Sequence, residues 1–268
     1  MDFREVFGSR KPVIGVVHLL PLPGSPGYRF NLDEVVKRAV GDAEAYYEAG
    51  FNGIIVENYG DIPYYPNRVG PETIASMTYI ATRIRDRVDI PVGINVLRND
   101  AISAIAIAHA VGGRFIRVNV LTEAYVTDQG IISGRAYEVL RYRSIIGAGD
   151  VMIFADVHVK HAYPLLHRSI EDSALDMVHR GLADALIVTG RRTGMPPDVS
   201  TVASVKKAVG DVPVIIGSGI TEDNVGGYVD YCDGFIVGTS VKRGRVTLNP
   251  VDRILARRLV KKLRDLLG

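Results

Sequence analysis

VPVIIGSGITEDNVGGYVDYCDGFIVGTS, residues 212–240, holds two short apolar runs, and each run ends in glycine. β-Branched residues dominate both runs, so each run is predicted to be a buried strand. A segment with helical or turn character separates them, which is typical of neighbouring strands in a parallel sheet. The same alternation recurs along the whole chain, and the number of its repeats indicates the fold.

Eight strands are predicted, and a longer amphipathic segment follows each of them. The strands are 13–18, 53–58, 91–96, 115–120, 151–158, 184–189, 212–217 and 233–238. The helices are 32–49, 71–88, 100–111, 134–146, 169–179, 199–209, 222–229 and 250–267. Eight strand–helix units in 268 residues predict an α/β fold, a (β/α)8 TIM barrel, as one domain over residues 1–268. A doubly wound open sheet is the competing architecture, but no linker or second domain is evident.

Composition excludes several classes of protein. The 32 basic and 30 acidic residues nearly balance, so no nucleic-acid partner is expected. One cysteine, Cys232, and a charged start without an apolar core indicate a cytoplasmic protein. The apolar segment 101–111 is too short to be a transmembrane segment, and it is a candidate contact of a homo-oligomer. The basic helix 250–267 could touch an anionic membrane, but we expect it to cover the first strand.

Polar residues mark the carboxyl ends of several predicted strands, where barrels place their functional groups. The segment FADVHVKHA, residues 154–162, begins apolar and ends in titratable side chains. Alternate strand residues share a face, so Asp156, His158 and Lys160 are predicted to point the same way. His18 ends the first strand and Glu57 the second, and both are expected at the mouth of the barrel.

Two chemistries suit the pair Asp156 and His158. The carboxylate could orient the imidazole for general acid–base catalysis, with Glu57 and His18 assisting. Alternatively, Asp156 and His158 could bind a divalent metal, with Glu57 or His18 completing the set, and this is the only cofactor that the pattern suggests. A buried polar network without catalytic function is the remaining interpretation. Lys160 could form a Schiff base or anchor an anion, or it could lie beyond the strand end in solvent.

Further side chains are candidates for substrate binding. On the third and fourth strands these are Asn95, Arg117 and Asn119, and Arg117 either pairs with Glu57 or clamps an acidic substrate.

Two loops add further candidates. Asp128 lies in the long loop 121–133, which is either a lid or an ordinary turn. Thr189 and Arg191 belong to the loop 189–198, which could close over a phosphate.

The glycine-rich ends of the last two strands predict a phosphate site. Glycine lets the backbone approach an anion, and barrels often bind phosphate after strands seven and eight. The predicted contacts are Gly217, Ser218, Gly219, Gly238, Thr239 and Ser240. Two tight turns are the alternative. Lys242 and Arg243 could add charge, although exposed basic residues of this kind are usually solvated.

Several of these segments together resemble the BtpA/SgcQ family. They are VIGVVHLLPLPGSP, LTEAYVTDQGIISGRAYEVLRYR, FADVHVKHA, VTGRRTGMPPD and VIIGSGITEDNV, spread over nearly the whole chain. The resemblance implies a branch of the ribulose-phosphate-binding barrels. It also implies a link to photosystem I accumulation in a cyanobacterial member and to sugar-transport genes in a bacterial one.

We therefore expect a cytosolic enzyme that acts on a small phosphorylated metabolite, such as a sugar phosphate or a nucleotide-derived compound. Isomerisation, bond cleavage by a lyase and hydrolysis all suit such a pocket, because the fold does not determine the reaction. A non-catalytic assembly or biogenesis factor is the alternative, and a metabolite sensor is another.

Overall fold

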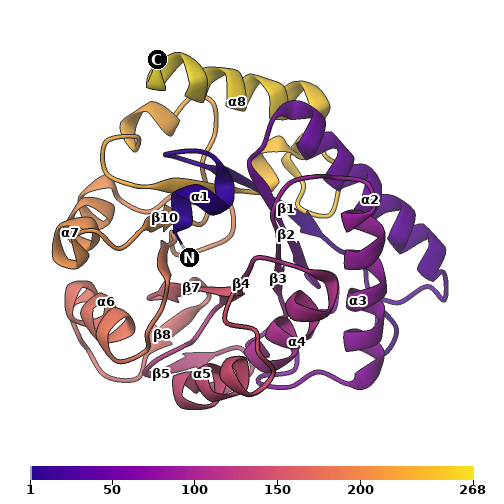
Figure 1. Cartoon of the computed structure of the whole chain (residues 1–268), viewed down its shortest axis with the longest axis horizontal. Helices are drawn as coiled ribbons and strands as arrows, with labels where there is room; N and C mark the ends of the chain where they lie inside the picture. The colour runs from indigo at the N-terminus through magenta and orange to yellow at the C-terminus, as the bar shows by residue number, and fades with distance from the viewer. Residues whose placement is uncertain (1) are drawn as a thin grey trace.

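A computed structural model of the chain describes residues 2–268 and shows a closed barrel of parallel strands (Figure 1). Its strands are β1 (Val13–His18), β2 (Gly53–Glu57), β3 (Val92–Asn95), β4 (Phe115–Val118), β7 (Met152–Val157), β9 (Ala185–Val188), β10 (Val214–Ile216) and β11 (Gly234–Val237). Around the barrel their order is β1-β11-β10-β9-β7-β4-β3-β2, and β1 pairs with both β2 and β11. The prediction of a (β/α)8 barrel is confirmed, and the open sheet is excluded.

Helices surround the barrel, as Figure 1 shows. They are α2 (Leu32–Ala49), α3 (Pro71–Arg85), α4 (Ala101–Val111), α5 (Ala136–Ile145), α6 (Ile170–His179), α7 (Val199–Val209) and α8 (Arg253–Leu267). The helix predicted at 222–229 is wrong, because only the short 3-10 turn η1 (Val225–Gly227) forms there. Its sequence contains the pair Gly226-Gly227, and glycine is unfavourable in a helix interior.

Local signals explain where the helices begin and end. The Asn31 side chain accepts a hydrogen bond from the backbone N–H of Glu34 at the start of α2, and Gly50 ends that helix in the left-handed conformation. Asp100 caps α4 in the same way, and Gly112 ends it. The ends of α2 and α4 are therefore determined by local sequence.

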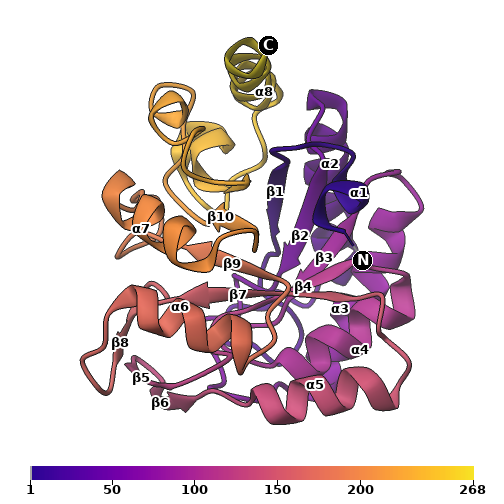
Figure 2. The same ribbon diagram turned by 60° about the vertical axis from the view of Figure 1, so that its left-hand side comes forward.

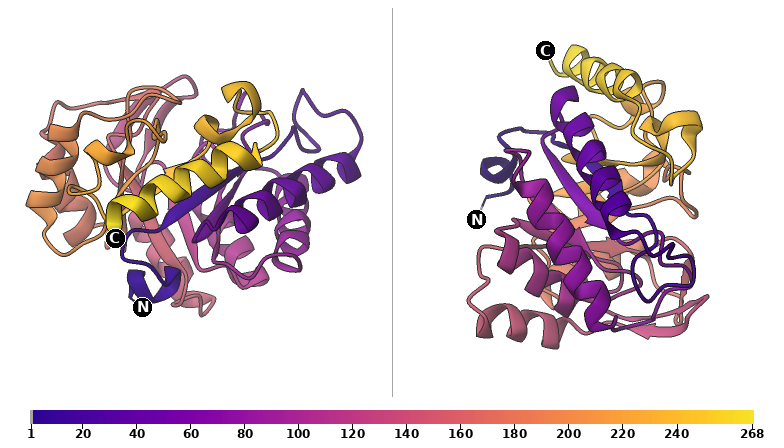
Figure 3. Two further views of the ribbon diagram at one scale, coloured as in Figure 1. Left: turned by 90° about the horizontal axis from the view of Figure 1, so that it is seen from above. Right: turned by 90° about the vertical axis from the view of Figure 1, so that its right-hand side faces the viewer.

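Apolar residues fill the barrel interior and close its amino-terminal end. Phe115 and Phe154 stack inside, with ring centroids 4.7 Å apart. The unpredicted helix α1 (Phe3–Phe7) adds Phe3 and Phe7 to this cluster, with Phe7 5.4 Å from Phe115. Figure 3 shows α1 set against one end of the barrel. A cavity can therefore open only toward the other end, where the strands finish.

A small antiparallel sheet replaces the predicted loop 121–133. It consists of β5 (Ala124–Thr127), β6 (Gly130–Ser133) and β8 (Ala162–Pro164), in the order β6-β5-β8. It lies beside α6 and far from α8 (Figure 2). The alternation in the segment AYVTDQGIIS around a two-residue turn explains the hairpin. Val126, Ile131 and Tyr163 are its exposed apolar side chains.

The two helices singled out in the sequence pack against the barrel. In α4 most side chains are buried, including Ile105 and Ile107, so its apolar composition is explained by the core. In α8 the buried stripe contains Leu259 and Leu263, and this helix lies beside α2. Among residues 2–268 there is no helix with the length and hydropathy needed to cross a bilayer.

Candidate functional site

Strand alternation builds one polar layer inside the carboxyl end of the barrel. The apolar interior side chains include Val16, Ile55, Phe115, Phe154, Ile187, Ile215 and Ile236. Two residues further along the same strands stand His18, Glu57, Arg117, Asp156, Thr189, Gly217 and Gly238. Because alternate residues share a face, this second set lies directly above the first. His18, Glu57 and Asn95 are also level in the register of β1, β2 and β3.

Two glycines leave space in this layer. A Cβ atom on Gly238 would lie 2.6 Å from Cε1 of His18, and one on Gly217 would lie 2.4 Å from Cγ2 of Ile187. Contacts that short do not occur between real side chains, so larger residues would displace their neighbours. The missing side chains open the β10–β11 half of the barrel mouth.

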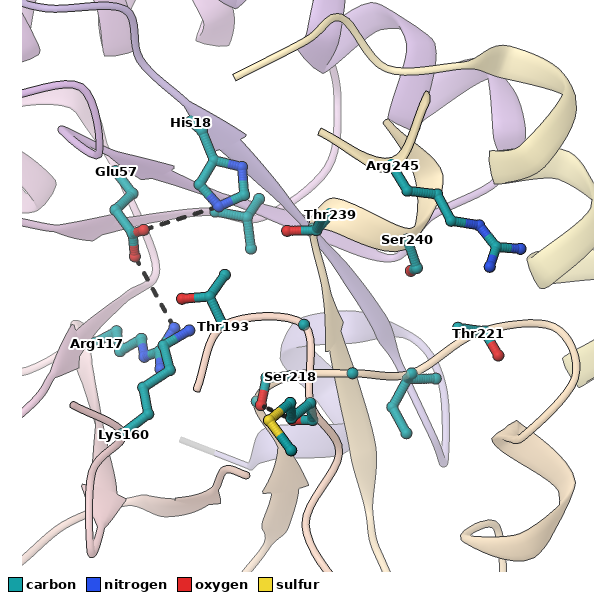
Figure 4. Close-up of a pocket in the computed structure, with 17 residues that line it drawn as sticks. His18, Glu57, Arg117, Lys160, Thr193, Ser218, Thr221, Thr239, Ser240 and Arg245 are labelled. Atoms are coloured by element: carbon teal, nitrogen blue, oxygen red, sulfur yellow. Dashed lines mark hydrogen bonds and ion pairs between the residues drawn. The ribbon is translucent and has the colours of Figure 1, made fainter. Parts of the chain in front are cut away.

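A cavity of about 360 Å³ lies at this place (Figure 4). Its lining consists of Val16, His18, Glu57, Arg117, Lys160, Thr193, Gly194, Met195, Gly217, Ser218, Gly219, Ile220, Thr221, Gly238, Thr239, Ser240 and Arg245. The volume suits a small metabolite. Figure 4 shows titratable side chains on one side and hydroxyl groups with Arg245 on the other.

Arg117 and Asp156 form a buried ion pair at the base of the titratable side. The guanidinium donates two hydrogen bonds to the Asp156 carboxylate, at 3.0 and 2.9 Å. Asn119 donates a third at 2.7 Å, and Asn95 donates to the backbone carbonyl of Arg117 at 3.1 Å. Burial alone would lower the pKa of Arg117, but the carboxylates of Asp156 and Glu57 together outweigh burial and raise it. Asp156, Asn95 and Asn119 therefore support Arg117 and do not themselves line the cavity.

Glu57 and His18 stand next to this pair. One carboxylate oxygen of Glu57 is 3.9 Å from Nη1 of Arg117, and the other is 3.9 Å from Nε2 of His18. Burial lowers the pKa of His18 well below its usual value, and the charges of Lys242, Lys160 and Arg117 lower it further. The imidazole is therefore neutral at pH 7, and its buried Nδ1 has no hydrogen-bond partner within residues 2–268. A neutral imidazole can accept a proton from a ligand.

His158 does not share the face of Asp156, which corrects the sequence interpretation. Strand β7 ends at Val157, and His158 has a φ of +49°, so the alternation stops there. Its Nε2 lies 3.1 Å from the hydroxyl of Ser173 on α6, and that hydroxyl donates to Glu123 at 2.9 Å. His158 is thus outside the cavity and belongs to a separate polar cluster.

The candidate metal ligands are not brought together. Asp156 is occupied by Arg117 and Asn119, and His158 faces Ser173. Between residues 2 and 268 no group of three or more histidine, cysteine, aspartate or glutamate side chains is placed to hold a metal ion. Of the predicted ligands Asp156, His158 and Glu57, Glu57 alone lines the cavity, so these three do not form a metal site there.

Lys160 lines the cavity although it lies beyond the strand end. Its backbone carbonyl accepts a hydrogen bond from Nη2 of the buried Arg98 at 2.7 Å. The neighbouring His161 has a φ of +57°, and its Nε2 lies 3.1 Å from the hydroxyl of Thr193. Contacts on both sides of its peptide therefore turn Lys160 inward, which the strand alternation alone could not establish.

The loop 189–198 reaches the cavity through residues other than those predicted. Thr193, Gly194 and Met195 line it, whereas Arg191 is exposed and contacts His161 only through its backbone carbonyl. Thr189 is half-buried, and its hydroxyl oxygen has no partner in the described part of the chain.

Asp128 is exposed at the tip of the β5–β6 hairpin, away from the lining. Thr189, Arg191 and Asp128 are therefore outside the set of lining residues.

The glycine loop after β10 holds the loop 189–198 in place. The Ser218 hydroxyl donates to the carbonyl of Met195 at 2.9 Å and accepts from the N–H of Gly190 at 3.2 Å. Gly219 has a φ of +73°, and a Cβ atom there would lie 2.0 Å from the backbone nitrogen of Pro196. Glycine is required for this close approach. The Ser218 side chain thus serves as a tie between loops, while its backbone borders the cavity.

The loop after β11 supplies the hydroxyl groups of the opposite side. Thr239 and Ser240 start the 3-10 turn η2 (Thr239–Val241), and the Ser240 hydroxyl has no protein partner within residues 2–268. The first N–H groups of such a turn also lack acceptors within the turn. Because these groups can donate hydrogen bonds, they suit an anion rather than a cation.

Arg245 is the basic residue that the sequence interpretation missed. Lys242 is fully buried and donates to Asp42 at 2.7 Å, so it stabilises the contact between α2 and the last loop. Arg243 is exposed and outside the cavity lining. Gly244, with a φ of +63°, turns the chain so that Arg245 reaches the cavity. The Lys-Arg-Gly-Arg sequence indicated charge here, but not which side chain faces the site.

Fold and cavity together define the class: a (β/α)8 barrel with a polar pocket at the carboxyl ends of its strands. The BtpA family model matches residues 9–265, and the chain belongs to the BtpA family. A protein from Pyrococcus abyssi is 50% identical over 96% of this chain and 98% of its own length. The photosystem I biogenesis protein BtpA from Synechocystis is 49% identical, over 91% of this chain and 84% of that protein. The resemblance inferred from the sequence motifs is confirmed.

Solved structures share the fold at low sequence identity. The thiamine phosphate pyrophosphorylase from Pyrococcus furiosus superimposes with a TM-score of 0.61 at 15% identity, over 97% of this chain and 98% of that one. The likeness concerns the barrel architecture and not the identity of the residues that line the cavity.

Proposed function

We propose that this protein is an enzyme that acts on a small phosphorylated metabolite bound in the barrel mouth. The observation that carries the proposal is the two-sided cavity. One side offers His18, Glu57 and Lys160 for proton transfer or covalent chemistry, and the other offers hydroxyl groups and Arg245 for an anion. A phosphorylated compound presents an anion at one end and a reactive carbon skeleton at the other.

The anion side favours phosphate. Backbone loops with glycine at positions 217, 219 and 238 line it, so the peptide groups are accessible to a bulky ligand. Ser240 has a hydroxyl group to donate, and Arg245 adds positive charge at the rim. Hydrogen bonds from a charged donor to a phosphate are stronger than those between neutral groups. The name of the thiamine phosphate pyrophosphorylase, which has the same fold, refers to a phosphorylated compound, and this supports the proposal.

The titratable side favours acid–base chemistry. Neutral His18 can take a proton from a bound ligand, and Glu57 lies 3.9 Å from its Nε2, where it favours the imidazolium that results. Arg117 is held by Asp156 and cannot give up its proton. His18, Glu57 and Lys160 are thus the proposed reactive groups, and Arg117 with Asp156 and the two asparagines is the proposed support.

Arg245→Ala is expected to weaken binding of inorganic phosphate about fivefold to tenfold, because a charge-assisted contact is lost at a partly solvated rim. Isothermal titration calorimetry at low ionic strength measures this affinity. Arg243→Ala is the matched control, since Arg243 is exposed and does not line the cavity. Equal losses in the two variants would contradict the assignment, because they would indicate general electrostatics rather than a contact.

A further inference from the structure

Lys160 differs from the other lysines that contact the protein interior. Lys242 donates to Asp42 at 2.7 Å, Lys206 to Asp233 at 2.7 Å, and Lys11 to the carbonyl of Cys232 at 2.7 Å. The Lys160 amine has no hydrogen bond or ion pair with any residue of the described range 2–268. An amine that faces a cavity without a protein partner is available to a ligand.

The position of this amine is determined by its backbone. Arg98 donates to the Lys160 carbonyl, and the adjacent His161 contacts Thr193 of the opposite loop. The preceding residue, Val159, is buried in the cluster under the small sheet. Three contacts therefore hold the segment 159–161, and the side chain extends from a fixed point into the cavity (Figure 4).

The electrostatic surroundings favour the neutral amine. Burial, and then the positive charge of Arg117, lower the pKa of Lys160 to about 8. The carboxylates of Glu57 and Asp156 oppose this shift, but Arg117 occupies Asp156, and Arg98 adds a second positive charge. Lysines desolvated beside another cation are nucleophilic at neutral pH. A lysine that only anchors an anion would gain nothing from a lowered pKa.

We propose that Lys160 forms an imine with the carbonyl carbon of a phosphorylated aldehyde or ketone whose phosphate lies at the Ser240 and Arg245 side. The inference rests on the proposed function, because it places the substrate in the same cavity. It narrows the substrate class from phosphorylated metabolites to those that carry a carbonyl group.

The covalent step uses groups that line the cavity. The neutral amine attacks the carbonyl carbon, a C–N bond forms, and the carbonyl oxygen takes up the proton that the nitrogen releases. The hydroxyl group so formed then leaves as water with one further proton, which comes from the solvent, and a C=N bond whose nitrogen keeps its remaining proton is left. Neutral His18 is the group that can accept and return the proton during these transfers. The resulting protonated imine withdraws electrons from the neighbouring carbon, which suits cleavage or isomerisation there.

Reductive trapping tests this step. The purified protein is incubated with dihydroxyacetone phosphate, glyceraldehyde 3-phosphate or erythrose 4-phosphate and sodium cyanoborohydride, which reduces the C=N bond to a stable secondary amine. We expect one adduct per chain, located at Lys160 by peptide mapping, and at least tenfold less labelling with unphosphorylated dihydroxyacetone. The exposed lysines Lys37 and Lys207 provide the internal standard for non-specific modification.

The pH dependence distinguishes Lys160 from ordinary lysines. Only the neutral amine attacks, so the initial labelling rate at Lys160 should rise as pH increases toward about 8 and then level off. A surface lysine keeps gaining neutral amine up to its usual pKa of about 10.4. Its neutral fraction at pH 7 is therefore more than roughly a hundredfold smaller than that of Lys160. A labelling rate at Lys160 that parallels Lys207 between pH 6 and 9 would overturn the proposal.

Two variants separate this inference from the proposed function. Lys160→Arg lacks a primary amine and cannot form an imine, so it should give no adduct. Lys160→Met should also give no adduct. If no probe labels wild-type Lys160, the imine is refuted. In that case calorimetry with inorganic phosphate tests the proposed function separately. If phosphate binds, the pocket assignment holds and Lys160 is an anchor for the anion. If phosphate does not bind, the pocket assignment is refuted as well.

Discussion

Asp156→Ala is expected to lower the free energy of unfolding by about 3–5 kcal/mol, because it leaves a buried guanidinium without its partner. Arg117 is 3% exposed, and its remaining carboxylate neighbour, Glu57, is 3.9 Å away. Little of the uncompensated charge would be hydrated, so its desolvation would be repaid only in part. Urea unfolding followed by circular dichroism measures the change.

An exposed aspartate provides the matched control for this variant. Asp150 lies 3.6 Å from Arg114, with about half of its side chain exposed. Asp150→Ala should change the free energy of unfolding by less than about 1 kcal/mol, as solvated pairs do. If Asp156→Ala cost no more than Asp150→Ala, Arg117 would have another partner, and the buried pair would not be the support of the site.

Gly219→Ala is expected to weaken the binding of inorganic phosphate at least about tenfold, or 1.4 kcal/mol. The added Cβ would lie 2.0 Å from the nitrogen of Pro196 and 2.3 Å from the carbonyl carbon of Met195. Both are backbone atoms, so the loop that carries Thr193 to Met195 must move. The φ of +73° is also unfavourable for alanine. Calorimetry below the melting temperature measures the affinity.

Gly227→Ala is the control on the same β10–β11 connection. A Cβ there meets nothing within 4 Å, and its φ is not in the left-handed region. This variant should bind phosphate as wild type does. Unchanged affinity in Gly219→Ala, with the protein folded, would show that the loop 189–198 has no part in the anion site.

The predictions from sequence were most accurate for side chains that lie on the regular strands. His18, Glu57, Arg117 and Asp156 lie two residues beyond buried interior positions of the same strands, so counting along each strand places them inside the barrel. Glycines after β10 and β11 were visible as well, because glycine at a strand end marks close approach or open space. The fold and one wall of the cavity therefore follow from local pattern.

The predictions failed where the backbone leaves the strand. His158 adopts a positive φ directly after β7, which ends the alternation and sends its side chain toward α6. Lys160 enters the cavity because Arg98 and Thr193, distant in sequence, hold the peptide around it. Arg245 rather than Lys242 reaches the cavity, because the Lys242 amine donates to the buried Asp42 of α2 instead. Such tertiary contacts have no local signal.

The barrel mouth is proposed to bind a phosphorylated small molecule. The most direct test is the melting temperature of the wild-type protein with sugar phosphates, each paired with the same sugar without phosphate. A ligand at about 100 times its Kd stabilises the folded state by about 2.7 kcal/mol. For a chain of this size that corresponds to a rise of about 5 °C or more. We predict such a rise with at least one phosphate and none with its unphosphorylated partner. Equal shifts within every pair, or none at all, would contradict the claim and direct the search for function to the outer surface.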